Sequence, residues 1–382
     1  VSASSRDDTI AWYENDGNAN PSWTAADIAT SANGAQSVFV ADMDNDGDMD
    51  LFIGSRSVPR EYGIIPKSYL LINDGAGNFT DETSKYAPAV SKVGMVTDAI
   101  WIDLNDDSYE DLVLVGEWMP IRIFYNSTDG FTEVTDQYGL QNTTGWWNTI
   151  AAGDFNNDGH IDLVVGNLGL NSFLKASNTQ PVQLYINDFS GNNKLEQILT
   201  YYNGSQVYPL ASRDMMIENI PFLAEKYPKY ADFAGEAIDD IFNEDLLQSA
   251  QVRKAVEFAS VVLMNNGDET FTKINLPIEV QFSPVYAILV DDFDKDGFQD
   301  MLTGGNFSGV PPELGRYDAS YGNVLLGEGT GSFKSASLQS SGFIVTEEIR
   351  QMKKIKTPNN QNQILVVRNN NTTVIFNQLQ NK

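Results

Sequence analysis

The chain has 382 residues, of which 42% are hydrophobic, and it carries 24 basic against 52 acidic side chains, for a formal net charge of −28. A surface with this charge repels nucleic acid and anionic lipid and attracts cations, so we expect no nucleic-acid partner. The absence of cysteine excludes disulfides and thiol catalysis, and the single histidine leaves no material for zinc sites rich in these two residues. No apolar run approaches the roughly 18 residues that span a bilayer, so we expect no direct insertion into a membrane.

The N-terminal residues have the character of the middle of a folded unit. Residues 1–17 hold neither the basic segment nor the apolar segment of a signal peptide. Residues 8–27 have the pattern of the later strands of a repeat whose loop is missing. We therefore expect the chain to be a mature or excerpted part of a longer protein.

An acidic loop recurs along the chain. Its first copy lies in residues 41–54, ADMDNDGDMDLFIG, where aspartate stands at loop positions 1, 3, 5 and 9 and glycine at position 6. Well-formed copies begin at residues 42, 103, 154 and 292, and a degenerate copy begins at residue 188. The predicted metal-binding residues of the five copies are Asp42, Asp44, Asp46, Asp48 and Asp50; Asp103, Asn105, Asp107, Tyr109 and Asp111; Asp154, Asn156, Asp158, His160 and Asp162; Asp188, Ser190, Asn192 and Glu196; and Asp292, Asp294, Asp296, Phe298 and Asp300.

Oxygen ligands at this spacing indicate calcium. Calcium takes six to eight oxygens at about 2.3–2.6 Å, and position 7 is expected to contribute its backbone carbonyl, which explains why its side chain varies. An EF-hand would end with glutamate at position 12 between helices, whereas here an apolar strand follows position 9 directly. The pattern therefore predicts about four calcium ions in β-hairpin loops, with a fifth, weaker site at Asp188–Glu196. A single such loop can also be an Asx-rich turn without metal, but the repetition favours metal binding.

The segments around the loops predict the architecture. A short strand precedes each well-formed loop, and a strand–turn–strand unit closes each repeat, at residues 68–83, 121–135, 261–275 and 323–337. Four short strands per repeat are typical of a β-propeller blade. Counting five loops and one blade at each end, the sequence predicts a single all-β domain over residues 1–382, a seven-bladed β-propeller with calcium-binding hairpin loops. Six or eight blades are alternatives, because the loops at 154 and 188 begin too close together for a full blade.

One segment breaks the strand pattern. Ile238, Ile241, Phe242, Leu246 and Leu247 recur at helical intervals, which predicts a helical insertion over about 213–259. The insertion either covers an irregular blade or binds a partner.

The loops, the apolar strands after them and the glycine-rich turns together resemble FG-GAP/VCBS repeats, the calcium-loop propeller repeats that also occur in the heads of integrin α-chains. The likeness covers nearly the whole chain. Residues 145–177, 181–192 and 208–242 resemble VCBS-repeat proteins of the UnbV/cartilage-acidic-protein-like group, which are typically exported or surface-bound in Bacteroidetes. The resemblance implies a calcium-stabilised propeller for adhesion or binding, located outside the cell or at the outer-membrane surface. Ser108 in place of glycine, the altered loop at 188 and a last repeat without acids depart from the pattern.

Few residues offer common catalytic chemistry. His160 is the only histidine and lies at position 7 of a loop, so a Ser-His-Asp or Cys-His site lacks its parts. We expect a non-catalytic module whose partner is a protein or a glycan, including the case of a subunit in a larger surface assembly. Trp118, Trp146 and Trp147 either stack on sugars or pack between blades. The alternative is a lyase or hydrolase acting on a polysaccharide through tyrosine, basic or paired acidic residues.

Overall fold

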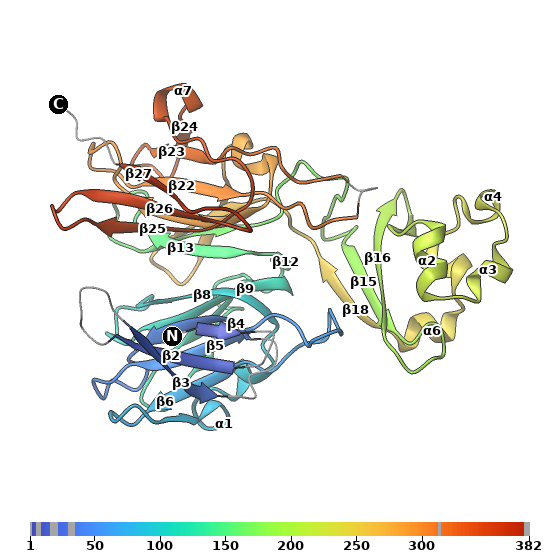
Figure 1. Ribbon diagram of the computed structural model, residues 1–382, viewed down its shortest axis with the longest axis horizontal. Coiled ribbons are helices and arrows are strands. Elements are labelled where there is room, and N and C mark those ends of the chain that lie inside the picture. The colour runs from blue at the N-terminus through green and yellow to red at the C-terminus, as the bar shows by residue number, and fades with distance from the viewer. Residues whose placement is uncertain (1, 5–8, 16–21, 30–34, 312–314, 378–382) are drawn as a thin grey trace.

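Short antiparallel strands pair into seven sheets over the residues that the computed structural model describes, which are 2–4, 9–15, 22–29, 35–311 and 315–377 (Figure 1). The first three sheets comprise β1 (Ser2–Ser4), β2 (Thr9–Asn15) and β3 (Trp23–Ala29); β4 (Ala35–Ala41), β5 (Asp50–Ser55), β6 (Tyr69–Asn73) and β7 (Phe79–Asp81); and β8 (Met95–Ile102), β9 (Asp111–Met119), β10 (Arg122–Tyr125), β11 (Thr132–Glu133) and β12 (Gly145–Trp146). The next two comprise β13 (Thr149–Gly153), β14 (Asp162–Gly166), β19 (Val261–Asn265) and β20 (Phe271–Asn275); and β15 (Val182–Asn187), β16 (Glu196–Asn203), β17 (Gln206–Pro209) and β18 (Gln251–Ala255). The last two comprise β21 (Val285–Asp291), β22 (Asp300–Gly305), β23 (Asn323–Gly327) and β24 (Phe333–Ser335); and β25 (Ile349–Lys356), β26 (Asn362–Arg368) and β27 (Val374–Asn377).

Six of these sheets follow one another side by side in chain order. Their first strands form a series of contacts that runs from β1 to β4, β8, β13, β21 and β25. This arrangement is consistent with a propeller-like fold, in which each sheet packs its faces against its two neighbours.

The strand that follows each of the four well-formed loops, β5, β9, β14 or β22, is buried on both faces, which explains the continuous apolar runs after these loops. In β9, Leu112 and Leu114 face the cluster shared with the sheet of β4–β7, whereas Val113 and Val115 face the cluster shared with β14 and β19. Successive side chains of a strand point to opposite faces, so one apolar run supplies both interfaces. Separate core clusters of this kind lie between each consecutive pair of the six sheets.

The sheet of β15–β18 is an insertion within another sheet. Strand β14 pairs with β19, so the chain leaves the fourth sheet after Gly166, forms β15–β18, and returns at Val261. The prediction of seven blades treated the loop at 188 as the start of a blade of its own. In the structure this loop joins β15 to β16 in the inserted sheet, outside the series of first strands.

Short helices cover one side of the inserted sheet. They are α2 (Arg213–Asn219), α3 (Leu223–Lys226), α4 (Tyr230–Phe233), α5 (Ile238–Ile241) and α6 (Glu244–Ser249), and with β15, β16 and β18 they occupy one end of the molecule (Figure 1). The expected helical segment, about 213–259, extends too far, since residues 251–255 form β18. This stretch pairs with β15, from Gln251 opposite Ile186 to Ala255 opposite Val182, and the helical spacing of apolar residues has already ended.

The remaining helices are single turns beside the sheets. They are α1 (Thr83–Tyr86), the 3-10 helices η1 (Pro88–Lys92) and η2 (Ile278–Phe282), and α7 (Leu338–Ser341). No helix among the described residues combines the length and apolar character needed to cross a membrane.

Candidate metal-binding loops and a central cavity

The five predicted loops occupy equivalent places in five sheets. Each connects two antiparallel strands, and the residue before position 1 pairs with position 9. The pairs are Ala41 with Asp50, Ile102 with Asp111, Gly153 with Asp162, Asn187 with Glu196, and Asp291 with Asp300. The loops therefore share one hairpin register.

Their backbones also agree. Positions 4 and 6 have positive φ in every copy, a conformation that glycine, asparagine and aspartate adopt most readily. At position 6 the φ angles are 97° for Gly47, 90° for Gly159, 94° for Gly297, 71° for Ser108 and 62° for Asn193. Ser108 thus keeps the turn that glycine makes in three of the other copies, so this departure from the pattern does not change the loop.

The acid at position 9 is buried beneath the loop and joins it to the sheet. Asp50, Asp111, Asp162 and Asp300 are fully buried. One carboxylate oxygen accepts the backbone N–H of position 2, at 2.8 Å from Phe155 to Asp162 and 3.0 Å from Leu104 to Asp111. The other accepts a backbone N–H at or just after the end of the third strand; the donors are Asn73, Asn126, Asn265 and Gly327, at 2.7–2.9 Å.

Burial raises the pKa of these carboxyl groups. The pKa rises to about 6 for Asp111 and for Asp162, because burial, assisted by the neighbouring acids at positions 5 and 1, outweighs the backbone hydrogen bonds. Burial and, more weakly, the acids at positions 3 and 5 also raise the pKa of Asp50. Gathering like charges in this way is unfavourable unless a cation is present.

Backbone amides orient the acids at positions 1 and 5. The N–H of position 6 donates to position 1, for example 3.0 Å from Gly159 to Asp154, and the N–H of position 7 donates to position 5, for example 2.9 Å from His160 to Asp158. The same contacts occur in the copies at 42, 103 and 292, and in the copy at 188 with Asn192 at position 5. The position 7 side chain, by contrast, is partly exposed in Asp48, Tyr109, His160 and Phe298.

Two loops bring three acids within reach of one ion. Oxygen atoms of Asp42, Asp44 and Asp50, and likewise of Asp292, Asp294 and Asp300, lie within 4.8 Å of one another, so each group can hold a metal ion. The copies at 103 and 154 have Asn105 and Asn156 at position 3, whose carbonyl oxygens replace a carboxylate on the same backbone. An all-oxygen donor set of this kind fits calcium.

The loop at 188 closes partly on itself. Glu196 is longer than aspartate, and its carboxylate accepts hydrogen bonds from the backbone of Phe189 at 2.8 Å and from the Ser190 hydroxyl at 2.7 Å. Position 3 therefore donates to position 9 instead of offering a free carboxylate. Only Asp188 and Glu196 are acidic among the four predicted side-chain ligands of this copy, which agrees with the expectation of a weaker site.

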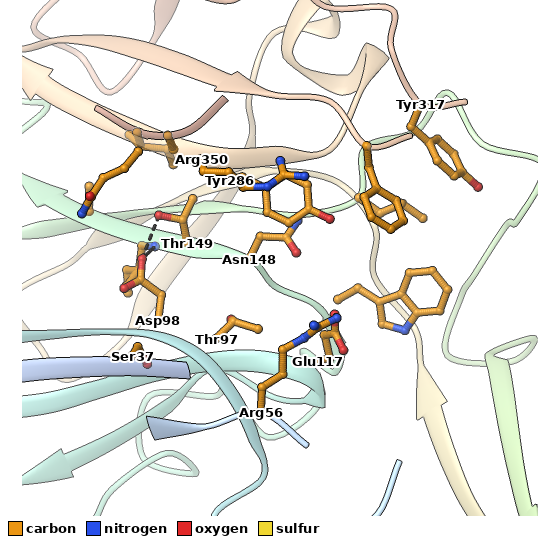
Figure 2. A pocket seen from close by; sticks show the side chains of 18 of the residues that line it. Ser37, Arg56, Thr97, Asp98, Glu117, Asn148, Thr149, Tyr286, Tyr317 and Arg350 are labelled. Atoms are coloured by element: carbon orange, nitrogen blue, oxygen red, sulfur yellow. Dashed lines mark hydrogen bonds and ion pairs between the residues drawn. The ribbon is translucent and has the colours of Figure 1, made fainter. Parts of the chain in front are cut away.

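The molecule contains a central cavity, and Trp146 is the one residue of its lining that was singled out from the sequence. The cavity has a volume of about 1260 Å³ and lies between the first strands of five sheets, β4, β8, β13, β21 and β25. Its polar lining includes Arg56, Glu117, Asn148, Tyr286 and Arg350, and Figure 2 shows Arg56 with Glu117 on one side and Arg350 with Tyr286 on the other.

These residues occupy two recurring places in the repeat. Ser37, Thr97, Asn148, Tyr286 and Arg350 lie at or near the start of a first strand, and Arg56 and Glu117 lie at the end of a second strand or just after it. Both places are opposite the hairpin end that holds the acidic loop, so the cavity residues and the loops lie at opposite ends of the strand pairs. The number of residues between each of these positions and the acidic loop of its sheet is the sequence signal that could have identified them, except for Arg350, whose sheet has no acidic loop.

The polar cavity residues form two groups, one on each side of the cavity. Arg56 and Glu117 form an ion pair at 2.6 Å, and the Tyr62 hydroxyl donates to the second Glu117 oxygen at 2.7 Å. The Trp118 indole N–H donates to that hydroxyl at 2.9 Å. On the opposite side, the Arg350 guanidinium lies 4.3 Å from the centre of the Tyr286 ring.

The three singled-out tryptophans divide between core and cavity. Trp147 is fully buried, Trp118 is 7% exposed, and both belong to core clusters. Trp146 lines the cavity, with its ring centre 5.0 Å from that of Trp118. Packing thus accounts for Trp147 and Trp118, and Trp146 alone faces the cavity.

Comparison with known proteins supports the repeats. The family model for the FG-GAP-like repeat matches residues 1–53 and 103–165, and that for the FG-GAP repeat matches residues 146–185. No curated protein matches the chain. Among solved structures, the Vibrio cholerae biofilm matrix protein Bap1 is similar, with 10% identity over 97% of this chain and 84% of that chain and a TM-score of 0.31. An Agrocybe aegerita lectin that recognises non-reducing terminal N-acetylglucosamine is also similar, with 13% identity over 91% of this chain and 82% of that chain and a TM-score of 0.31.

At such TM-scores neither structure informs the function. The family matches coincide with the acidic loops at 42, 103 and 154 and with the strands that flank them. The chain therefore contains FG-GAP repeats.

Proposed function

We propose that this chain is an exported, calcium-stabilised β-propeller that binds a protein or glycan at the cell surface without catalysing a reaction. The observation that supports it best is one loop geometry repeated in five sheets, with oxygen atoms offered at positions 1, 3, 5 and 9. Calcium binding would relieve the repulsion between these acids and lock each hairpin. We also propose that the chain belongs to the UnbV group of Bacteroidetes proteins, which residues 145–177, 181–192 and 208–242 resemble.

We further propose that six sheets close into a ring and that the sheet of β15–β18 lies outside it. The contacts that run from β1 to β25 in chain order support six blades. A closed ring buries the apolar outer faces of the first and last sheets, which an open stack would leave exposed. A crystal structure of the calcium-loaded protein tests this, and a gap between β25 and β1 would contradict it.

The calcium proposal is tested by stoichiometry. Chelator-treated protein is titrated with calcium in a calorimeter, and the metal content of the dialysed product is measured by mass spectrometry. We expect about four calcium ions per chain, with a fifth of lower affinity. Fewer than three ions, or equal heats for calcium and magnesium, would contradict the proposal, because magnesium requires a tighter octahedral site.

The inserted helices are the surface we propose for a protein partner, together with one propeller face. Phe222 is 44% exposed and Tyr230 is 67% exposed, whereas the neighbouring Leu223 is fully buried. Phe222→Asp should abolish partner capture and leave the melting temperature unchanged. Leu223→Ala is the matched control that should lower stability, by roughly 2–4 kcal/mol. If Phe222→Asp leaves capture intact, the helices only cover the sheet.

The cavity supports binding more than catalysis. Burial, followed by the Glu117 charge, raises the pKa of Tyr286 to about 12, and the same two causes raise the pKa of Tyr62, so neither is a ready base near neutral pH. Both Glu117 oxygens are held by Arg56 and Tyr62, and both Asp98 oxygens also accept hydrogen bonds. Defined oligosaccharide products from a polysaccharide would favour the enzyme alternative.

A further inference from the structure

The cavity gathers positive charge in an acidic chain. Its lining includes three basic residues, Arg56, Arg350 and Lys353, and two acidic residues, Asp98 and Glu117. The whole chain has 24 basic against 52 acidic residues, so the lining is much less acidic than the chain as a whole, with Arg56 paired to Glu117 and Arg350 paired to Glu348. A concave site concentrates the field of its own charges, and this one therefore favours an anionic ligand that the outer surface repels.

Both arginines are held in place and remain open to solvent. The Arg56 side chain is 41% exposed and that of Arg350 is 29% exposed. Arg350 is fixed by Tyr286 beneath it, by Glu348, and by the Asn306 carbonyl at 3.0 Å. A guanidinium has five N–H donors, and within the described residues Arg56 uses one, toward Glu117. Fixed guanidinium groups with spare donors match a carboxylate well.

The rest of the lining is aromatic and polar. The rings of Tyr286 and Phe307 lie 6.4 Å apart, and Trp146 stands in the same lining. The polar lining includes the Asn148 amide and the Tyr286 hydroxyl, and such groups can exchange hydrogen bonds with the hydroxyl groups of a ligand.

We infer that the central cavity binds an acidic sugar, a pyranose unit that carries a carboxylate, with Arg56 and Arg350 toward the carboxylate and the aromatic rings against the sugar. The volume of about 1260 Å³ accommodates an oligosaccharide and is far larger than an inorganic anion requires. Aromatic faces with a few placed polar groups suit a ring that has apolar faces and polar edges. This inference rests on the proposed binding function and names the ligand class for it.

Trigalacturonate and its methyl ester form the test pair, because the ester keeps the sugar rings and removes the charge. Both are titrated into calcium-saturated protein by calorimetry. We expect the acid to bind with a Kd below about 1 mM and the ester to bind at least about tenfold more weakly. Equal affinities, or no saturable binding of the acid, would overturn the inference. So would inorganic sulfate that competes as well as the sugar acid, because the site would then recognise a bare anion.

Two arginine variants test whether the guanidinium groups recognise the carboxylate of the ligand. Arg350→Gln and Arg56→Gln should each weaken trigalacturonate binding on the order of tenfold. Arg122 provides the matched control: its guanidinium pairs with Glu133 at 2.6 Å and bonds the Val93 carbonyl at 2.7 Å, outside the cavity. Arg122→Gln should leave the affinity unchanged, and an equal loss there would contradict the assignment.

Folding and calcium binding are measured on the same samples. If a variant does not fold, the comparison of acid with ester on the native protein decides the question. Trigalacturonate binding without any bound calcium would refute the calcium proposal and leave the cavity assignment standing. Calcium binding together with equal binding of the acid and the ester would refute the cavity assignment and leave the calcium proposal standing.

Discussion

At the scale of the residue, the aspartate at loop position 9 joins the acidic loop to the sheet beneath it. In Asp111, one oxygen accepts the N–H of Leu104 within the loop and the other accepts the N–H of Asn126 beyond the third strand, so the side chain joins loop and sheet without any ion. Asp107, at position 5, is exposed and accepts hydrogen bonds only within the loop. Asp111 therefore has a structural role whether or not the proposed calcium ion is bound, whereas Asp107 would contribute mainly as a ligand of that ion.

This difference predicts how two substitutions in one loop respond to calcium. Asp111→Ala leaves two buried N–H groups unpaired and should lower the free energy of unfolding by roughly 2–4 kcal/mol, both in calcium and in chelator. Asp107→Ala should lower stability in calcium only. Urea unfolding under both conditions measures the two effects, with Asp129→Ala, an exposed hairpin acid, as the control. Equal losses for Asp107→Ala in both conditions would show that the loop does not use metal.

A half-buried carboxylate of the cavity lining, Asp98, predicts a pH dependence. Burial raises the pKa of Asp98, although Thr149, Ile150 and Ala99 donate hydrogen bonds to it. Because the folded state holds this proton more tightly than the unfolded state, stability from Asp98 is full below about pH 4 and is lost as pH rises through the raised pKa. Lys353 is the charged neighbour that opposes the shift.

Asp98→Asn removes the titration and keeps the shape. The stability of the variant relative to the native protein should therefore increase between pH 4 and pH 7. Denaturant unfolding in calcium at a series of pH values measures the difference. A constant difference across this range would mean that Asp98 has an ordinary pKa.

At the scale of the element, the acidic loop packs against the closing hairpin of its own sheet. A Cβ added to Gly267 would overlap the His160 ring, and one added to Gly75 would overlap Asp48. His160 and Asp48 are both position 7 residues, so the glycine of the turn leaves space for whichever side chain stands there. This contact explains why the glycine-rich turns accompany the loops in the sequence.

The contact can be isolated by comparing two glycines with similar backbones. Gly267 has φ of 73° and meets His160, whereas Gly204 has φ of 64° and has open space around its Cα. Both alanine variants should lose about 1 kcal/mol from backbone strain, and Gly267→Ala should lose more because of the overlap. His160→Ala in the same chain should restore the additional loss. An identical effect of the two glycine substitutions would mean that His160 moves aside freely.

At the scale of the whole molecule, the formal charge of −28 is expected to lower the stability of the fold through repulsion between acidic residues. Four or five calcium ions, the number that we propose, would remove about a third of it at the places where acids are closest. The chain should therefore be much less stable after chelation, and the loss should affect several sheets because consecutive sheets share their core clusters.

Salt separates this electrostatic effect from ordinary packing. The screening length falls from about 10 Å at 0.1 M to about 3 Å at 1 M ionic strength, so raising sodium chloride should stabilise the chelated protein clearly. The same change should affect the calcium-loaded protein little. Thermal unfolding in chelator and in calcium at several salt concentrations measures both. If the melting temperature is the same in chelator and in calcium, the loops are ordinary turns that do not depend on metal.

Much of the loop geometry follows from the sequence alone, since the residues concerned lie within nine positions of one another. Asp154, Asp158 and Gly159 specify their turn through local hydrogen bonds and a positive φ. The continuous apolar runs after the loops and the helical spacing of Ile238 and Ile241 are equally local. The FG-GAP repeats, the strand–loop–strand units and an inserted helical segment could therefore be predicted before any tertiary contact was known.

Only the tertiary structure decided which sheets neighbour one another and what lines the centre. The pairing of β14 with β19 closes across residues 167–260. The close spacing of the loops at 154 and 188 indicates an irregular repeat there, but it does not reveal that the sheet of β15–β18 is inserted within another sheet. Arg56 and Glu117 stand 61 residues apart, and Tyr286 and Arg350 come from still later sheets. They meet because the sheets assemble around a common centre, and such long-range proximity depends on packing of the whole chain rather than on any local pattern.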